Sequence, residues 1–214
     1  HAMMGIAEPE GWTLTVESEI PVSRGLKSSS SACNAILSAV FDEYGYATES
    51  LQLIRAGVRC AKKAGVTVTG SFDDSCGCHF GGLTITDNTA NEILFQSDFA
   101  EHDVVLYVPE RKIRKSTIDK SRFDGYRPAM LAAIDMARTR PLDALTANGR
   151  IIAESSGLDN SMAEKALEMG ALAAGITGSG PAVAMVVESA QGGTFAEKMG
   201  TDNLIVTKIR RLSI

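Results

Sequence analysis

A run of small and polar residues from Pro21 to Ala35 most constrains how this chain folds and what it binds. Gly25, Leu26 and Lys27 lead into four consecutive serines, and small apolar residues at helical spacing follow. Glycine lets the backbone approach a ligand closely, and serine is favoured where helices begin. The first N–H groups of a helix have no partner within it, and the helix dipole favours an anion there. The run therefore predicts a phosphate-holding loop and helix N-terminus; a serine-capped helix without a ligand is the alternative.

The common nucleotide-binding motifs do not explain this run. In a P-loop, G-x-x-x-x-G-K-[ST], glycines would stand where this chain has Pro21 and Leu26. The dinucleotide fingerprint G-x-G-x-x-G is also absent. A serine hydrolase is excluded in the same way, since the sequence has no G-x-S-x-G elbow.

Composition excludes several other classes. The chain has 214 residues, of which 44% are hydrophobic and 22% charged, as in an ordinary globular protein with a real core. A net charge of −5 argues against a general nucleic-acid binder, and no apolar run has the length of a membrane span. We expect a cytoplasmic protein, with residues 1–3 an expression-tag remnant and no signal peptide. Reduced thiols are expected at Cys33, Cys60, Cys76 and Cys78.

A second informative run spans Gly70 to Gly82, where Asp73 and Asp74 lie among small residues. A carboxylate here suits a general base if a substrate hydroxyl comes within hydrogen-bonding reach, whereas an Asx-type turn is the alternative. The sequence Cys76–Gly77–Cys78–His79 offers only three crowded metal ligands without a second cluster, so packing near the active centre is the preferred interpretation. His79 is expected to be structural.

The third run, Gly175 to Val187, reads as a glycine-rich turn between a helix and a buried strand. Between the second and third runs lies a basic segment that is either solvated or placed over phosphates. Its charged and hydroxyl residues are Arg111, Lys112, Arg114, Lys115, Ser116, Thr117 and Arg122.

Together the three runs resemble the motifs of the GHMP kinases. Their second motif, Pro-x-x-x-Gly-Leu-Gly/Ser-Ser-Ser-Ala, aligns with Pro21 to Ser30, with Lys27 in place of the small residue and Ser30 in place of alanine. The resemblance implies that Asp74, which precedes a Gly-Gly pair, is the general base, with Asp73 as the fallback. It also implies ATP and Mg²⁺, with Ser29 as the metal contact. The implied nucleotide-binding residues are Gly25, Leu26, Lys27, Ser28, Ser29, Ser30, Ser31, Thr177, Gly178, Ser179 and Gly180.

Within the family, these runs look most like the archaeal type of shikimate kinase, which transfers the γ-phosphoryl group of ATP to the 3-hydroxyl of shikimate. Homoserine kinase or another small-molecule kinase is the near alternative, and a catalytically silent nucleotide-binding module is the second. The expected partners are ATP and shikimate, without nucleic acid or membrane, and self-association is left open. Arg24, Arg111 or Arg114 is expected to hold the substrate carboxylate.

The resemblance implies a two-layer α+β fold with two subdomains, 4–100 and 101–214, and the active cleft between them. Family members carry a longer N-terminal part before the serine-rich run, so we expect the first subdomain to be shortened, which puts ligand affinity and activity in question. The pattern Trp12, Leu14, Val16 predicts a strand, and Ser161 with Glu164 predicts a capping box. The other expected helices run from about Ser30 to Gly45, from Thr48 to Gly65, from Pro128 to Ala137, from Pro141 onward, and from Ser161 to Leu172 with a stop at Gly175. The other expected strands are 83–86, 104–108, 183–187 and 204–212. In the last strand, Arg210 and Arg211 are expected to point outward.

Overall fold

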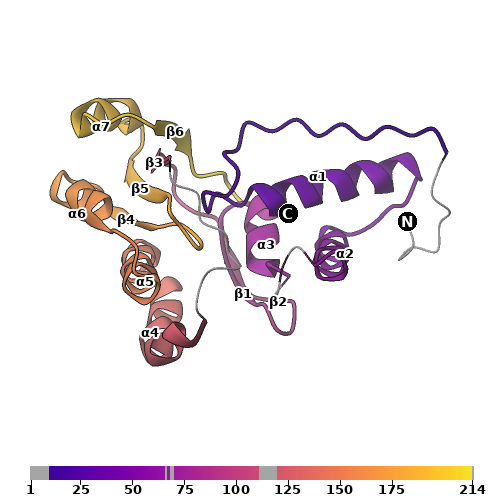
Figure 1. Ribbon diagram of the computed structural model, residues 1–214, viewed down its shortest axis with the longest axis horizontal. Helices are drawn as coiled ribbons and strands as arrows, with labels where there is room; N and C mark the ends of the chain where they lie inside the picture. The colour runs from indigo at the N-terminus through magenta and orange to yellow at the C-terminus, as the bar shows by residue number, and fades with distance from the viewer. Residues whose placement is uncertain (1–9, 66, 68–69, 111–119, 214) are drawn as a thin grey trace.

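The computed structural model describes residues 10–65, 67, 70–110 and 120–213, and Figure 1 shows them in two packed parts. The first part holds α1 (Ser28–Glu43), α2 (Ser50–Lys63), α3 (Phe72–Phe80), β1 (Leu83–Asp87) and β2 (Glu92–Ser97). The second holds β3 (His102–Tyr107), η3 (Lys120–Tyr126), α4 (Arg127–Ala137), α5 (Pro141–Ser156), α6 (Ser161–Glu168), β4 (Ala173–Ile176), β5 (Val183–Glu188), α7 (Gly192–Met199) and β6 (Leu204–Lys208). The basic segment 111–119 lies outside the described residues.

The first part packs α3 against both α1 and α2, with the antiparallel hairpin β1–β2 beside α3 (Figure 1). Apolar residues recur at helical spacing in α2, so one face of this helix is buried and the opposite face carries charge. The core of this first part joins Ile54 and Val58 of α2 to Phe72, Cys76 and Phe80 of α3. This packing fixes the orientation of α3, the helix that carries Asp73 and Asp74.

The second part is a four-stranded antiparallel sheet, ordered β4-β5-β3-β6, with helices packed against it. Strands β5 and β3 run through its centre, where Val105, Val183 and Met185 are almost fully buried. Helices α5, α6 and α7 contact the sheet, and α4 packs on α5. The expected two-layer α+β fold with two subdomains is thereby confirmed; the boundary between residues 100 and 101 stays a prediction.

The predicted strand at Trp12–Val16 is wrong. Residues 12–19 have no strand structure, and Trp12, Leu14 and Val16 are each about half exposed. A strand requires hydrogen bonds from a neighbour, and no described strand lies beside this segment. Instead the segment runs along α1 (Figure 1), with Trp12 stacked on Tyr44 at 5.3 Å between ring centroids.

The predicted helix from Ser161 to Leu172 is too long, and its capping box does not form. The helix ends at Glu168, and its N-cap is Asn160 without a side-chain capping bond. Glu164 instead forms an ion pair with Arg150, whose guanidinium donates two hydrogen bonds to the carboxylate at 2.8 and 2.7 Å. Gly175 lies inside β4 rather than at a helix end. Its α-carbon packs closely against Gly149 of α5. The glycine-rich turn therefore joins two strands.

The last residues of the chain leave the second part and bind to the first. Gly82 N–H donates to Arg210 C=O at 2.8 Å, and Ser213 N–H donates to Phe80 C=O at 2.8 Å. Leu212 packs against the core around Phe72 and Phe80. We call residues 209–213 the C-terminal strap; it ties β6 to the end of α3. No described helix has both the length and the apolar character needed to cross a bilayer.

Candidate active site

The serine run forms the first turn of α1, as its sequence predicts. Lys27 is the N-cap with φ 62°, in the left-handed region, and its side chain makes no capping bond. Ser31 N–H donates to Lys27 C=O at 3.0 Å, which closes the first turn. The N–H groups ahead of Ser31 have no acceptor within the helix. The helix therefore presents uncapped backbone donors together with serine hydroxyls, as an anion site requires.

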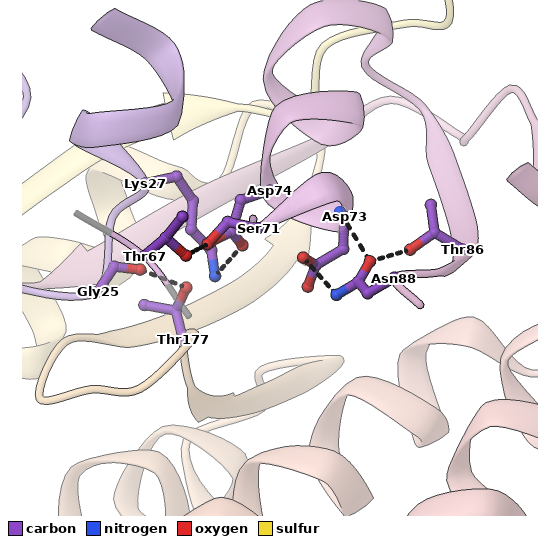
Figure 2. A network of polar contacts seen from close by, with 9 residues as sticks. All are labelled: Gly25, Lys27, Thr67, Ser71, Asp73, Asp74, Thr86, Asn88 and Thr177. Carbon is purple, nitrogen blue, oxygen red and sulfur yellow. Dashed lines mark hydrogen bonds and ion pairs between the residues drawn. The ribbon is translucent and has the colours of Figure 1, made fainter. Parts of the chain in front are cut away.

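Asp74 lies beside this turn. The Lys27 ammonium is 2.6 Å from Asp74 Oδ1, and Figure 2 shows the two side chains meeting between α1 and α3. The Asp74 side chain is 10% exposed and that of Lys27 is 31% exposed, so the pair is largely shielded from water. A further bond ties the two helices, since Asn34 Nδ2 donates to Ser75 C=O at 2.9 Å. Segments far apart in sequence thus bring a cation and a carboxylate to the serine turn.

The turn between β4 and β5 packs on the same loop. Thr177 Oγ1 donates to Gly25 C=O at 3.3 Å (Figure 2), and Ala182 N–H donates to Arg24 C=O at 3.0 Å. Gly25 has φ +83°, and a Cβ there would lie 2.4 Å from the Thr177 carbonyl oxygen. A Cβ on Gly178 would lie 2.5 Å from Lys27 Nζ. Gly25 is required because backbone of the third run closes over the first, whereas the contact at Gly178 is with the end of a flexible side chain.

A cavity of about 420 Å³ opens at this junction. This volume falls within the range of small-molecule binding sites. Its polar end is lined by the serine turn, Asp74 and Ser179, and its apolar part lies between α1 and α2. Of the nucleotide-binding residues implied by the sequence, Gly25, Leu26, Lys27, Ser28, Ser29, Ser30 and Ser179 line the cavity. Ser31, Thr177, Gly178 and Gly180 are not among its lining residues; Thr177 and Gly178 support the loop from behind.

Asp73 points away from Asp74, although both lie in the first turn of α3 rather than in an Asx-type turn. Asp73 N–H donates to Asn88 Oδ1 at 3.0 Å, and Asn88 Nδ2 donates to Asp73 Oδ1 at 2.8 Å. Thr86 Oγ1 donates to the same Asn88 oxygen, so Asp73 is held at the end of β1 (Figure 2). The geometry therefore favours Asp74 over Asp73 as the group that meets a ligand in the cavity. Sequence reasoning did not find Asn88, which carries no motif.

The cysteines are free thiols where the structure describes them. The pKa of Cys76 is raised to about 12, mainly by burial and also by nearby Asp73, while Arg55 opposes the rise. Burial likewise raises the pKa of Cys33, with Cys60 adding to the effect. In the described part of the chain, no three His, Cys, Asp or Glu side chains are grouped to hold a metal ion. Cys76 belongs to the packing of α3, as expected.

The assignment of the substrate carboxylate to Arg24, Arg111 or Arg114 stays a prediction. The Arg24 guanidinium donates to the Pro109 carbonyl, while Arg111 and Arg114 lie outside the described residues. Arg210, expected to point outward, donates instead to the carbonyl oxygens of Cys78 at 3.3 Å and His79 at 2.8 Å. It binds there because the last carbonyls of a helix lack internal partners. The C-terminal strap therefore brings a cation to α3 that sequence reasoning missed.

Comparison with known proteins identifies the class to which this fold and site belong. Residues 2–82 match the GHMP kinases N terminal domain, and residues 130–204 match the GHMP kinases C terminal domain. The chain belongs to the GHMP kinase family. The arrangement of the three sequence runs around one cavity agrees with that assignment.

Similar curated relatives include archaeal enzymes named shikimate kinase. The chain is 36% identical over 204 residues to that of Methanococcoides burtonii, covering 93% of this chain and 71% of the relative. It is 37% identical to that of Pyrococcus abyssi, covering 82% of this chain and 64% of the relative. The chain thus spans roughly two thirds of the length of these relatives.

Solved structures share the fold at low sequence identity. Methanococcus jannaschii mevalonate kinase superposes with a TM-score of 0.72 at 16% identity, over 92% of this chain and 67% of that one. Homoserine kinase from Cytophaga hutchinsonii gives a TM-score of 0.66 at 16% identity, over 92% and 68%. At this level of identity these structures establish the fold alone.

Proposed function

We propose that this chain is an ATP-dependent kinase that phosphorylates the 3-hydroxyl of shikimate. The observation that carries the proposal is the contact of Lys27 with Asp74 at the mouth of the serine-lined cavity. The identity with archaeal shikimate kinases over most of the chain supports shikimate as the acceptor. A carboxylate beside an anion site is the arrangement that phosphoryl transfer to an alcohol needs, because positioning and charge neutralisation dominate that reaction.

The serine end of the cavity is the proposed site of the ATP phosphates. Uncapped N–H groups of α1, the hydroxyls of Ser28 to Ser30 and the Lys27 ammonium all face this end. The residues present fit Mg²⁺ as well, since this ion is held by few protein oxygens together with substrate phosphates. Ser29 is the proposed protein contact, and the bound ion would neutralise charge on the phosphates.

Asp74 is the proposed general base. Its carboxylate accepts the proton of the acceptor hydroxyl as that oxygen attacks the terminal phosphorus of ATP, and the bond from that phosphorus to the bridging oxygen breaks, so that ADP leaves. Lys27 holds the carboxylate at the edge of the phosphate site, so that the hydroxyl and the phosphoryl group come together. The turn of Thr177 to Gly180 keeps the serine loop in place.

A coupled assay of ADP release with shikimate, homoserine and mevalonate as separate acceptors tests the proposal. We expect release with shikimate well above the rate without an acceptor, and little with the other two. Release with homoserine or mevalonate instead would assign another GHMP kinase activity. ATP binding without release from any acceptor would favour a silent nucleotide-binding module.

A further inference from the structure

One face of α3 is open between two cations. Asp74, Gly77 and Cys78 share this face because they are three and four residues apart in a helix. Asp74 and Cys78 are partly buried, whereas Gly77 is exposed, and among the described residues nothing lies within 4 Å of a Cβ built on it. Lys27 stands at one end of the face, against Asp74, and Arg210 stands at the other, against the carbonyls of Cys78 and His79.

The charged groups around this face interact electrostatically with the Cys78 thiol. Burial raises the pKa of the Cys78 thiol, and Asp74 raises it further, while Lys27 and Arg210 both lower it. Charges at both ends of the face are therefore within electrostatic reach of one sulfur atom. From Asp74 to Cys78 the helix advances by about 6 Å, and the carbonyls that bind Arg210 point beyond Cys78 toward the end of the helix, so the base and Arg210 are about two helical turns apart.

We propose that the acceptor lies along this face, with its reacting hydroxyl at Asp74, its ring over Gly77 and its carboxylate on Arg210. The assignment rests on the proposed function and adds to it the residue that recognises the substrate acid. In shikimate the carboxylate and the 3-hydroxyl are attached to ring carbons separated by a single carbon. Bond lengths put these groups about 5 Å apart, and a hydrogen bond of about 3 Å at each end lets the acceptor bridge about two helical turns.

The chemistry of Arg210 suits this role. A guanidinium has five N–H donors, and two of its nitrogens already donate to helix carbonyls, which fixes its plane. The remaining donors are available to a carboxylate, and Arg210 is exposed to solvent. The strap holds the residue rigidly, since the backbone bonds of Gly82 and Ser213 flank it. Gly77 supplies the space, because any side chain there would project over the same face.

Steady-state kinetics of Arg210→Met test the assignment, with Arg211→Met as the matched control. Arg211 is the neighbouring strap arginine, but it pairs with Asp98 and Glu101 away from α3. We expect Arg210→Met to raise the KM for shikimate about 10- to 100-fold, with the KM for ATP unchanged. Arg211→Met should leave both values near those of the wild type. Arg210→Lys should recover only part of the loss, since lysine keeps the charge without the planar fork.

A neutral substrate separates recognition from a structural role. The wild type should prefer shikimate to its methyl ester, and Arg210→Met should lose this preference. An equal loss for acid and ester would mean that Arg210 acts only by holding the end of α3, and would overturn the assignment. A wild type that does not phosphorylate shikimate would overturn the proposed function itself, and the assignment with it.

Gly77→Leu gives an independent test. Glycine is a poor helix residue, so leucine should keep or raise the thermal midpoint of unfolding. The same change should raise the KM for shikimate about tenfold or more by filling the proposed ring site. An unchanged KM in the folded variant would contradict the placement of the ring.

Discussion

The Lys27 ammonium lies 2.6 Å from Asp74 Oδ1, although the two residues come from different sequence runs. The pair links the loop before α1 to the first turn of α3. Removing the Lys27 side chain should therefore affect chemistry more than folding. The backbone here is left-handed, which costs free energy for most residues with a Cβ, so glycine at this position would relieve strain.

Lys27→Gly is the informative change at this position. It should lower turnover about 10- to 100-fold, through the loss of a charge-assisted contact to Asp74 and to the phosphates. Its free energy of unfolding should fall by no more than about 2 kcal/mol, since relief of the left-handed strain offsets part of the cost of leaving the shielded Asp74 carboxylate without its cation. Kinetics and urea unfolding measure the two effects, with Lys208→Met on the exposed β6 as the charge control. Large destabilisation with normal turnover would contradict this account of Lys27.

Gly25→Ala tests the contact between the serine loop and the β4–β5 turn. A Cβ would lie 2.4 Å from the Thr177 carbonyl oxygen, and φ is +83°. Gly170→Ala is the matched control, because φ is +98° there with nothing within 4 Å of the built Cβ. Both should lose about 1–2 kcal/mol of stability through backbone strain. Gly25→Ala should lose more than Gly170→Ala and should also weaken ATP binding by calorimetry; equal effects would show that the collision is absent.

The C-terminal strap should weaken in acid. Hydrogen bonds from the Leu212 and Phe99 N–H groups lower the pKa of Asp98 below its ordinary value of 3.8, with Arg211 adding to the shift. A lowered pKa stabilises the fold above the ordinary value, and this contribution is lost as pH falls through the folded value. Asp98→Asn should therefore be less stable than the wild type at pH 7, with a difference that narrows below about pH 4.

Thermal unfolding from pH 7 to pH 3 measures this difference. Glu101→Gln is the control, because among the described residues Glu101 pairs with the Arg211 side chain but accepts no hydrogen bond from the strap backbone. The control should track the wild type more closely at every pH. A constant gap between Asp98→Asn and the wild type into the acid range would rule out the Asp98 carboxylate as its source.

Local patterns predicted much of the fold, since helices α1, α2, α4 and α5 and strands β1, β3 and β5 lie close to their expected positions. The errors arose where a tertiary partner decides the outcome. Trp12 to Val16 alternates as a strand does but lacks a neighbouring strand among the described residues. Glu164 had the spacing of a capping residue, but Arg150 competes for its carboxylate.

The candidate site was anticipated in part. The serine run and the choice of Asp74 over Asp73 came from motifs, and the structure brings Asp74, Ser179 and most of the serine run to one cavity, while Ser31, Thr177, Gly178 and Gly180 do not line it. The Lys27–Asp74 contact and the position of Arg210 carry no local signal, because each joins segments that only the folded chain brings together. These long-range contacts are what the structure adds.

Turnover and ATP affinity of Asp74→Asn, measured side by side with shikimate as acceptor, test the central claim most directly. Asparagine keeps the size of the side chain but cannot accept the hydroxyl proton. We predict that turnover falls about 10²- to 10⁴-fold while the dissociation constant for ATP changes little. Turnover equal to that of the wild type would contradict the assignment of Asp74 as the base.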